Sequence, residues 1–454
     1  MRVLKFGGTS VADAAAMERL VAIVGTRTGP RTVVVSALAS VTDRLLGIGE
    51  LALRDRAAAR AGLDALVARH LEVASALGGN GAAAVEPMLR GIARGAERTV
   101  DTIADTRAVT APLLDKLVAA GELCSSRLVA AFLAEAGLRA QWIDARHVVR
   151  TDGHHRQAAP DLEATEEAVR RHVRPALALE RIVVTGGFIG SGPDGATTTL
   201  GRGGSDYSAA ILGASLLADE IEIWTDVDGV YSADPRFVPD ARVLPAISYE
   251  DAETLATFGA KVLHPKTIEP AAALDIPVRV LNSRRPSQPG TRIDNAGSTG
   301  GAAVAARGSV TLVQVTARGR RPDRGFAARA LQALADAHVG MLVGEVYKGK
   351  LTVAVDHSVD VETLRARVAD FADLETREGL SAVCVVGDRL ARDPRLVTQA
   401  FAALGPRHVH LVGRPGGATS ALAVVVEDRD VQDLLARLHE ACAGGTPVAH
   451  EAVA

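Results

Sequence analysis

The sequence predicts an α/β sandwich on a mainly parallel sheet, followed by two small α+β modules. Three observations support this fold class. The chain has 454 residues, and at roughly 150 residues per domain this length predicts about three folding units. Short apolar runs alternate with helical patterns up to about residue 290. After a stretch rich in Gly, Ser, Pro and Asn at residues 288–301, a shorter strand–helix pattern occurs twice.

The larger domain is expected to contain buried strands that end in loops. These strands are apolar and rich in β-branched residues, and we predict them at residues 3–6, 32–36, 181–185, 220–224 and 276–281. Helical regions are predicted at residues 43–77 and 111–136, and apolar positions recur near 3.6 spacing in the second. Such alternation favours a parallel sheet covered by helices.

The rest of the chain is expected to form two modules of the same kind. The first would contain strands at residues 310–316 and 351–355 and helices at 326–337 and 361–371. The second would contain strands at residues 382–386, 409–412 and 422–426 and helices at 394–404 and 431–441. We therefore predict domains at residues 1–295, 305–380 and 381–454.

Composition excludes several classes of protein. The 51 basic residues do not outnumber the 54 acidic ones, so the basic surplus typical of nucleic-acid binding is missing. No apolar run approaches the roughly 18 residues that span a bilayer, and glycines interrupt the N-terminal apolar stretch before it reaches signal-peptide length. Cys124, Cys384 and Cys442 are too scattered for a disulfide framework or a zinc site. We expect a soluble cytoplasmic protein without nucleic-acid or membrane partners.

The first strand runs into a glycine loop, Lys5-Phe6-Gly7-Gly8-Thr9-Ser10, and a helical pattern follows from Ala12. Adjacent glycines allow backbone N–H groups to converge on an anion, and a helix N-terminus adds its positive dipole end. Lys5 would place an ammonium group beside this loop. The segment lacks the P-loop pattern, and a tight turn with a solvated lysine is the alternative.

A second glycine loop lies at residues 197–206, between a strand and a helix. Arg202 stands among its glycines, and a guanidinium group suits a carboxylate or phosphate. Ser205 and Asp206 could instead be helix caps only. Residues 190–195 formally match the dinucleotide pattern G-x-G-x-x-G, but they contain a proline and no helix follows, so we interpret them as a loop.

Two further segments combine polar residues with a strand end or a glycine. Residues 224–236 follow a predicted strand, where Tyr231 could stack on a nucleobase and the aspartates could hold ribose or Mg²⁺; Asx turns would explain the aspartates equally well. Residues 258–265 place Lys261 close to a glycine. His264 precedes a proline and is more typical of a packed or capping histidine than of a catalyst.

In their order along the chain and in their residues, these segments resemble the aspartate kinase (aspartokinase) family. This family belongs to the wider amino-acid kinase fold, which is a three-layer sandwich. Gly121-Glu122-Leu123 and Gly187-Phe188-Ile189-Gly190 add to the match. The two small modules resemble the paired ACT domains of that family, and the resemblance is nearest to its monofunctional, lysine-sensitive members. It implies ATP-dependent phosphorylation of the side-chain carboxylate of L-aspartate to 4-phospho-L-aspartate, the first step of the aspartate-family amino-acid pathway.

The resemblance also implies roles for individual residues. Lys5 and the Gly7 and Gly8 amides would hold the transferred phosphoryl group. Arg202 would grip the substrate α-carboxylate, and Asp206 would orient the lysine or organise the metal side. The substrate's amino and carboxylate ends would be fixed by Ser36, Thr42, Glu122 and Ser205. The nucleotide pocket would contain Thr225, Asp226, Tyr231, Arg236, Lys261 and Val262. Mg²⁺ would be held largely by phosphates and water, without a named protein ligand.

Two alternative functions remain open from sequence. One is a kinase of the same fold that acts on another amino acid or a specialised-metabolite carboxylate. The other is a catalytically silent amino-acid-binding regulator, which the presence of Lys5, Glu122, Arg202 and Asp206 disfavours. By resemblance, we also expect a homodimer or a higher homo-oligomer.

The regulatory segment departs from the lysine-sensitive pattern. Where that pattern has an acidic residue this chain has Leu342, and Val346-Tyr347-Lys348 replaces a Thr-Ser-Glu segment. Residues 323–326 would form the preceding effector loop. A lysine in place of a carboxylate repels a lysine effector, so we expect weak or absent lysine feedback. The alternative is a shifted loop in which Glu345 takes the acidic role.

Overall fold

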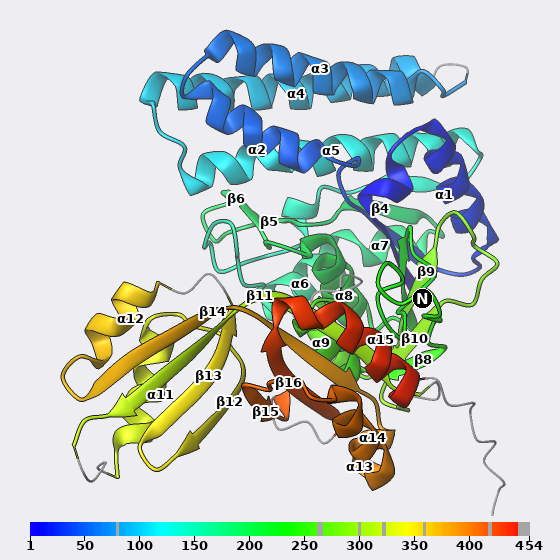
Figure 1. Ribbon diagram of the computed structural model, residues 1–454. Coiled ribbons are helices and arrows are strands. Elements are labelled where there is room, and N and C mark those ends of the chain that lie inside the picture. The colour runs from blue at the N-terminus through cyan, green and yellow to red at the C-terminus, as the bar shows by residue number, and fades with distance from the viewer. Residues whose placement is uncertain are drawn as a thin grey trace, which may run out of the picture. The chain divides into compact units, whose positions relative to one another are not determined.

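The computed structural model describes residues 1–78, 81–260, 267–297, 301–319, 324–356, 360–415 and 420–443 (Figure 1). The chain forms two compact units. Unit 1 contains Met1–Gly229 and Lys266–Asn295, and unit 2 contains Val230–Pro265 and Ala296–Ala454. The segment Val230–Pro265 thus belongs to unit 2, although it lies in the sequence between the two parts of unit 1. The predicted domain limits of 295, 305 and 381 stay a prediction.

Unit 1 is built on a mainly parallel sheet, as predicted. Its strands follow the order β3-β4-β2-β1-β7-β9-β10, and all neighbours are parallel except β9 and β10. The bounds are β1 (Arg2–Phe6), β2 (Arg31–Val35), β3 (Ala140–Trp142), β4 (Ile182–Gly186), β7 (Glu220–Thr225), β9 (Val278–Asn282) and β10 (Thr291–Asp294). A separate antiparallel pair consists of β5 (Ile189–Ser191) and β6 (Thr197–Thr199).

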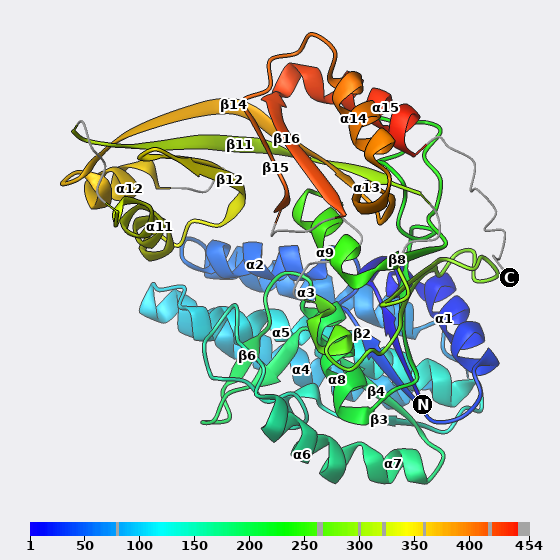
Figure 2. The same ribbon diagram turned by 90° about the horizontal axis from the view of Figure 1, so that it is seen from below.

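Helices cover both faces of this sheet (Figures 1 and 2). On one face α5 lies against the strands with α2 beside it, and α3 and α4 lie outside them; α6, α7 and α8 lie on the other face. The bounds are α1 (Ala14–Thr26), α2 (Val41–Ala52), α3 (Arg56–Ala74), α4 (Gly81–Thr106), α5 (Ala111–Glu135), α6 (Leu162–His172), α7 (Arg174–Ala178), α8 (Gly204–Leu216) and α10 (Glu269–Ala272), with short 3₁₀ turns η1 (Gly8–Val11) and η2 (Ala145–His147). The predicted three-layer sandwich is confirmed.

Helix α5 is the central helix of unit 1. Its apolar positions are spread all around its axis, which is typical of a buried helix. In the described part of the chain it is the one helix long and apolar enough to cross a membrane, but 78% of its most apolar window is buried within the protein. It contacts β3 and β4 and carries two buried acids, Asp115 and Glu122.

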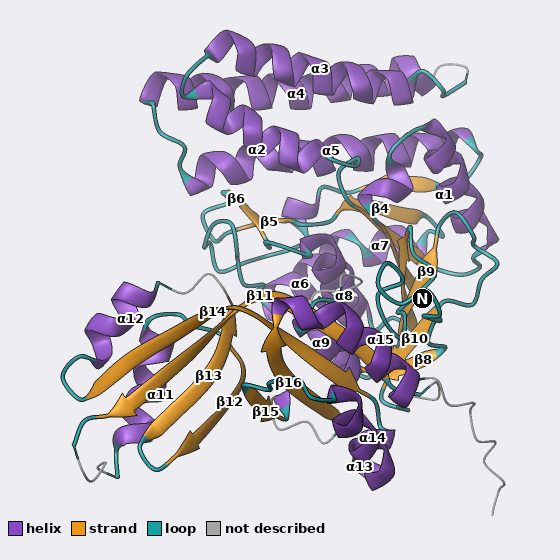
Figure 3. Ribbon diagram, viewed as in Figure 1, coloured by secondary structure: helices purple, strands orange, loops and turns teal. Residues whose placement is uncertain are grey.

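Unit 2 contains one six-stranded antiparallel sheet in the order β12-β13-β11-β14-β16-β15 (Figure 3). The bounds are β11 (Ala303–Ala317), β12 (Met341–Tyr347), β13 (Lys350–Asp356), β14 (Ala372–Val386), β15 (Leu411–Gly413) and β16 (Ala421–Glu427). The other elements are β8 (Ala246–Ser248), α9 (Tyr249–Thr257), α11 (Phe326–Asp336), α12 (Val361–Val368), α13 (Arg389–Arg392), α14 (Pro394–Leu404), η5 (Asp428–Asp430) and α15 (Val431–Cys442).

Two apolar cores share this sheet. One packs Val313 and Val315 under α11 and α12, and the other packs Val304 and Val383 under α14 and α15. Strands β11 and β14 are each 15 residues long and pass through both cores (Figure 2). The predicted strands at 310–316 and 382–386 are therefore halves of longer strands. Elements that the sequence did not predict include β3, β12, α4 and α6, and the helical region predicted at residues 43–77 is divided into α2 and α3.

Candidate active site

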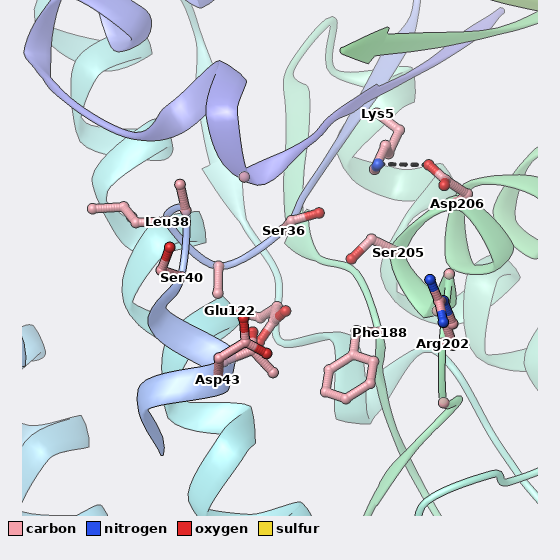
Figure 4. Close-up of a pocket in the computed structure, with 17 residues that line it drawn as sticks. Lys5, Ser36, Leu38, Ser40, Asp43, Glu122, Phe188, Arg202, Ser205 and Asp206 are labelled. Carbon is pink, nitrogen blue, oxygen red and sulfur yellow. Dashed lines mark ion pairs between the residues drawn. The ribbon is translucent and has the colours of Figure 1, made fainter. Parts of the chain in front are cut away.

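A cavity of about 340 Å³ opens in unit 1 where β1, β2 and β4 end (Figure 4). Parallel strands present their carboxyl ends at one edge, which is where α/β folds bind ligands. The cavity is lined by Lys5, Gly8, Ser36, Ala37, Leu38, Ala39, Ser40, Thr42, Asp43, Glu122, Phe188, Gly201, Arg202, Gly203, Gly204, Ser205 and Asp206. These residues come from the strand ends and the loops that follow them, from the starts of α2 and α8, and, for Glu122, from the middle of α5.

Lys5 and Asp206 form an ion pair within this cavity. The Lys5 Nζ lies 2.5 Å from the Asp206 Oδ1, and the two side chains are only 10% and 15% exposed (Figure 4). Lys5 comes from β1 and Asp206 from the first turn of α8. Because the pair is shielded from water, the carboxylate holds the ammonium group in a defined direction, beside the space that a ligand would occupy.

The start of α8 gives one side of the cavity a positive character. Gly203 has a φ of 73°, the left-handed region that glycine adopts without strain, and it precedes the first helical residue. A Cβ on Gly204 would meet the Phe188 ring at 2.7 Å, so only glycine allows this approach. The exposed guanidinium of Arg202 stands just before the helix. Together they form a site for an anion.

The other side of the cavity is acidic. Figure 4 shows Glu122 from α5 and Asp43 from the first turn of α2 on the side away from Lys5. Glu122 is 3% exposed, and burial raises its pKa to about 8 against the opposing influence of the Ala37 backbone. Among the described residues its Oε2 has no hydrogen-bond partner. A buried carboxyl oxygen without a partner is costly and suits a cationic ligand group.

Hydroxyl groups lie between these charged sides. Ser36 follows β2, and its N–H donates to the Phe6 carbonyl oxygen at 3.0 Å, which anchors the loop after the strand. Figure 4 shows Ser36 and Ser205 between Lys5 and Glu122. Thr42 lines the same cavity. The arrangement fits a small ligand with an anionic and a cationic end.

The structure corrects the predicted role of Gly7. Its N–H donates to the Trp224 carbonyl oxygen at 3.0 Å, so it is already used in holding β1 against β7 and is not presented to a phosphate. Gly7 does not line the cavity, whereas Gly8 does. A Cβ on Gly8 would meet the Ala37 carbonyl oxygen at 2.9 Å, which explains the need for glycine there.

The predicted nucleotide residues are not gathered in this cavity. Thr225 ends β7 in unit 1 and Asp226 follows it. The Ser283 hydroxyl donates to the Thr225 carbonyl oxygen at 3.1 Å, and the Asn282 amide donates to the Asp226 carbonyl oxygen at 3.4 Å. Tyr231 and Arg236 belong to unit 2, and Arg236 is exposed and paired with Asp234. Lys261 and Val262 lie outside the described residues. The cavity brings together Lys5, Gly8, Ser36, Thr42, Glu122, Arg202, Ser205 and Asp206.

Sequence reasoning missed two cavity residues with distinctive chemistry. Asp43 follows Thr42 in the first turn of α2, where an acidic residue is favourable whatever its function, so its position gives no functional signal. Phe188 has a φ of 66°, which is rare for an aromatic residue and cannot be read from the sequence. Its presence in the Gly187–Gly190 motif was the available signal.

Comparisons with known proteins agree with this geometry. The profile described as "Amino acid kinase family" matches residues 1–282. The chain is 34% identical to lysine-sensitive aspartokinase 3 of Escherichia coli, over 96% of this chain and 98% of that protein. It is 29% identical to chloroplastic aspartokinase 2 of Arabidopsis thaliana, over 97% of this chain and 84% of that protein.

Solved structures give the same result for the whole chain. Escherichia coli aspartokinase III in complex with aspartate and ADP (R-state) matches with a TM-score of 0.86 and 33% identity, over 97% of this chain and 99% of that one. The same enzyme in complex with lysine and aspartate (T-state) matches with a TM-score of 0.78 and the same identity and coverage. The chain therefore belongs to the amino acid kinase family and, within it, to the aspartokinases.

Proposed function

We propose that the cavity beside Lys5 is the site where L-aspartate is bound and phosphorylated. As an aspartokinase, the chain transfers the terminal phosphoryl group of ATP to the side-chain carboxylate of L-aspartate, giving ADP and 4-phospho-L-aspartate. The observation that carries the site assignment is the pairing of an acidic side and a cationic side around the Lys5–Asp206 ion pair. An amino acid with a carboxylate side chain has complementary charges.

The proposed chemistry depends on charge neutralisation. The attacking carboxylate is already ionised near pH 7, so no general base is needed. The obstacle is the repulsion between this anion and the phosphates of ATP, together with the need for in-line positioning. The Lys5 ammonium is directed by Asp206 and lies at the cavity wall. It would neutralise charge on the phosphoryl group during transfer.

The substrate would be held at its two charged ends. Arg202, Ser205 and the start of α8 would bind the α-carboxylate, and Glu122 would bind the α-ammonium group, with Ser36 and Thr42 between them. The raised pKa of Glu122 means that its carboxyl group is mostly protonated at pH 7 in the free enzyme. An arriving ammonium group favours the ionised form, so substrate binding is linked to loss of this proton.

Mg²⁺ would enter with the nucleotide. The part of the chain that the structure describes contains no group of three or more His, Cys, Asp or Glu side chains placed to hold a metal ion. Mg²⁺ commonly keeps several waters and binds through substrate phosphates and one or two carboxylates. Asp206 is the acid beside Lys5 and fits that single-carboxylate role. Thr225, Asp226, Tyr231, Arg236, Lys261 and Val262 remain the proposed nucleotide contacts.

A substrate panel tests the proposal. The purified chain is assayed for ADP formation with L-aspartate, L-glutamate, N-acetylglutamate and no acceptor. ADP formation should be fast with L-aspartate and close to the acceptor-free rate with the others. A kinase for another carboxylate would show a higher kcat/KM for a different acid. A silent regulator would show no aspartate-dependent turnover.

We propose that lysine inhibits this enzyme only weakly, although the E. coli relative has been crystallised with lysine. Lys348 lies at the two-residue turn between β12 and β13, with a φ of 43°. Its Nζ lies over the Tyr347 ring, 5.1 Å from the ring centre. Leu342 is buried, whereas Glu345 is exposed. A cation at this turn opposes a cationic effector. A homodimer in the cytoplasm is proposed from the family alone.

A further inference from the structure

Asp115 is a fully buried carboxylate that lies outside the cavity. Its exposure is 0%, and it sits on α5. The Thr199 Oγ1 donates to its Oδ1 at 2.6 Å, while the His155 Nδ1 and the Arg156 backbone N lie 2.8 and 3.0 Å from its Oδ2. A buried carboxylate is costly unless it is fully hydrogen-bonded, and here three donors from two other segments surround it.

One of these donors lies close to Arg202 in the chain, and the other two belong to a loop that contacts the same backbone. Thr199 ends β6, three residues before Arg202. The Thr199 carbonyl oxygen accepts from Ala158 N–H at 2.9 Å. Gly201 has a φ of 78°, and a Cβ on it would meet the Arg156 carbonyl oxygen at 3.1 Å. The loop that contains residues 155–158 is therefore pressed against the backbone that carries Arg202.

The Arg202 side chain is not fixed by contacts of its own guanidinium group. It is exposed, and in the part of the chain that the structure describes its guanidinium group has no hydrogen bond or ion pair. The direction of this side chain thus depends on the backbone from Thr199 to Gly203. Asp115 is the buried group that attaches that backbone to a long helix.

The same helix carries the acid at the other end of the cavity. Asp115 and Glu122 are seven residues apart, which is about two turns and roughly 10 Å along α5. Glu122 lines the cavity, whereas Asp115 lies beneath the Arg202 segment. Helix α5 thereby sets the separation between the two charged groups that hold the ends of the ligand.

We propose that Asp115 is a positioning residue that sets the distance between Arg202 and Glu122 and so selects the length of the amino acid that binds. The proposal rests on the proposed role of Arg202 at the substrate α-carboxylate. Asp115 acts through Thr199 and through the backbone of residues 155–156, and it does not contact substrate.

A matched pair of substitutions at Thr199 tests the link. Thr199→Val keeps the shape but removes the hydroxyl donor, and Thr199→Ser keeps the donor. The KM for aspartate should rise about tenfold in Thr199→Val, because a displacement of about 1 Å at a binding group costs one to two orders of magnitude. The KM for ATP should stay within about twofold, and Thr199→Ser should behave like the wild type. Equal aspartate KM values for Val and Ser would overturn the proposal.

A double-mutant cycle separates positioning from general destabilisation. Asp115→Asn cannot accept hydrogen bonds at both oxygens and should also raise the aspartate KM. In an Arg202→Lys background, the same substitution should have a much smaller effect, because both changes act on one contact. If Asp115→Asn raised the aspartate KM by the same factor in the wild type and in the Arg202→Lys background, the proposal would be overturned. Asp152→Asn, an exposed acid in the same loop that pairs with His154, serves as the control and should leave the KM unchanged.

The same variants distinguish this proposal from the assignment on which it rests, the role of Arg202 at the substrate α-carboxylate. If Arg202→Lys alone leaves the aspartate KM unchanged, the role of Arg202 at the substrate is wrong, and the positioning role falls with it. If Arg202→Lys raises the aspartate KM but neither Asp115→Asn nor Thr199→Val does so, only the positioning role is wrong. Thermal unfolding of each variant shows whether the folded protein was assayed.

Discussion

The Lys5 ammonium lies 2.5 Å from the Asp206 carboxylate, although the two residues are 201 positions apart in the chain. Strand β1 brings one to the cavity edge, and the first turn of α8 brings the other. The pair gives Lys5 a defined direction in a shielded site. An electrostatic group that is already oriented stabilises a transition state without the cost of reorganisation.

Lys5→Ala should lower kcat by roughly 10²–10³, the scale of losing one preorganised electrostatic donor. The KM for ATP should change much less, because the interaction strengthens in the transition state. Steady-state kinetics with aspartate and ATP varied separately measure both effects. Lys116→Ala, an exposed lysine on α5, is the matched control and should leave kcat unchanged. A Lys5→Ala variant that keeps more than about a third of the wild-type kcat would exclude this role.

Arg202→Lys should raise the KM for aspartate strongly, while the KM for ATP moves little. A planar guanidinium group can form two parallel hydrogen bonds with a carboxylate, and an ammonium group cannot. Arg44→Lys, an exposed position on α2 outside the cavity, is the control. If the KM for ATP rises and that for aspartate does not, Arg202 belongs to the nucleotide side of the site.

The KM for aspartate should fall as the pH rises from about 6.5 toward 8.5. Burial raises the pKa of Glu122 to about 8, so the carboxylate that would bind the substrate ammonium group forms over this range. In Glu122→Gln, the KM should be high at both pH values and lose this dependence. Calorimetry in two buffers of different ionisation enthalpy should also detect proton release on aspartate binding at pH 7 in the wild type. No proton release would contradict a protonated Glu122.

Glu122 also has a consequence for stability without ligand. Its folded pKa is above its unfolded value, so the folded state holds more protons between about pH 4.5 and pH 8. Stability therefore falls as the pH rises through this window, because a buried carboxylate is being ionised. Glu122→Gln should have a flatter dependence of the free energy of unfolding on pH. Chemical denaturation of both proteins at pH 5, 6, 7 and 8 checks this, and parallel curves would show that Glu122 titrates normally.

Lysine should inhibit this enzyme weakly or not at all. Allosteric coupling of about 1–3 kcal/mol is typical, so a repulsive cation at the effector site is enough to remove useful inhibition. Inhibition curves with lysine, threonine and both together provide the measurement. Lys348→Glu is the informative variant, since it restores a carboxylate at the β12–β13 turn and should increase lysine sensitivity. Half-inhibition of the wild type by lysine alone below about 1 mM would show that the regulatory segment was misinterpreted.

The sequence alone determined the fold class, the main strands of the parallel sheet and most of the charged groups of the cavity. Each of these leaves a local signal: β-branched apolar runs for β1, β2, β4 and β7, and glycine loops around Lys5 and Arg202. Strand ends and helix starts have local causes, and in a parallel sheet they meet at one edge. Resemblance to the family, and not a local physical signal, identified Ser36, Thr42, Glu122 and Ser205.

The tertiary structure alone decided which of these groups act together. Gly7 N–H bonds to Trp224, Lys5 pairs with Asp206, and Thr199 bonds to Asp115, all between segments that are far apart in sequence. Strands β11 and β14 extend through two cores because they pair with each other along their length. The raised pKa of Glu122 likewise follows from burial by neighbouring elements. Hydrogen-bond partners, strand length in a shared sheet and desolvation are properties of packing, so no local sequence pattern encodes them.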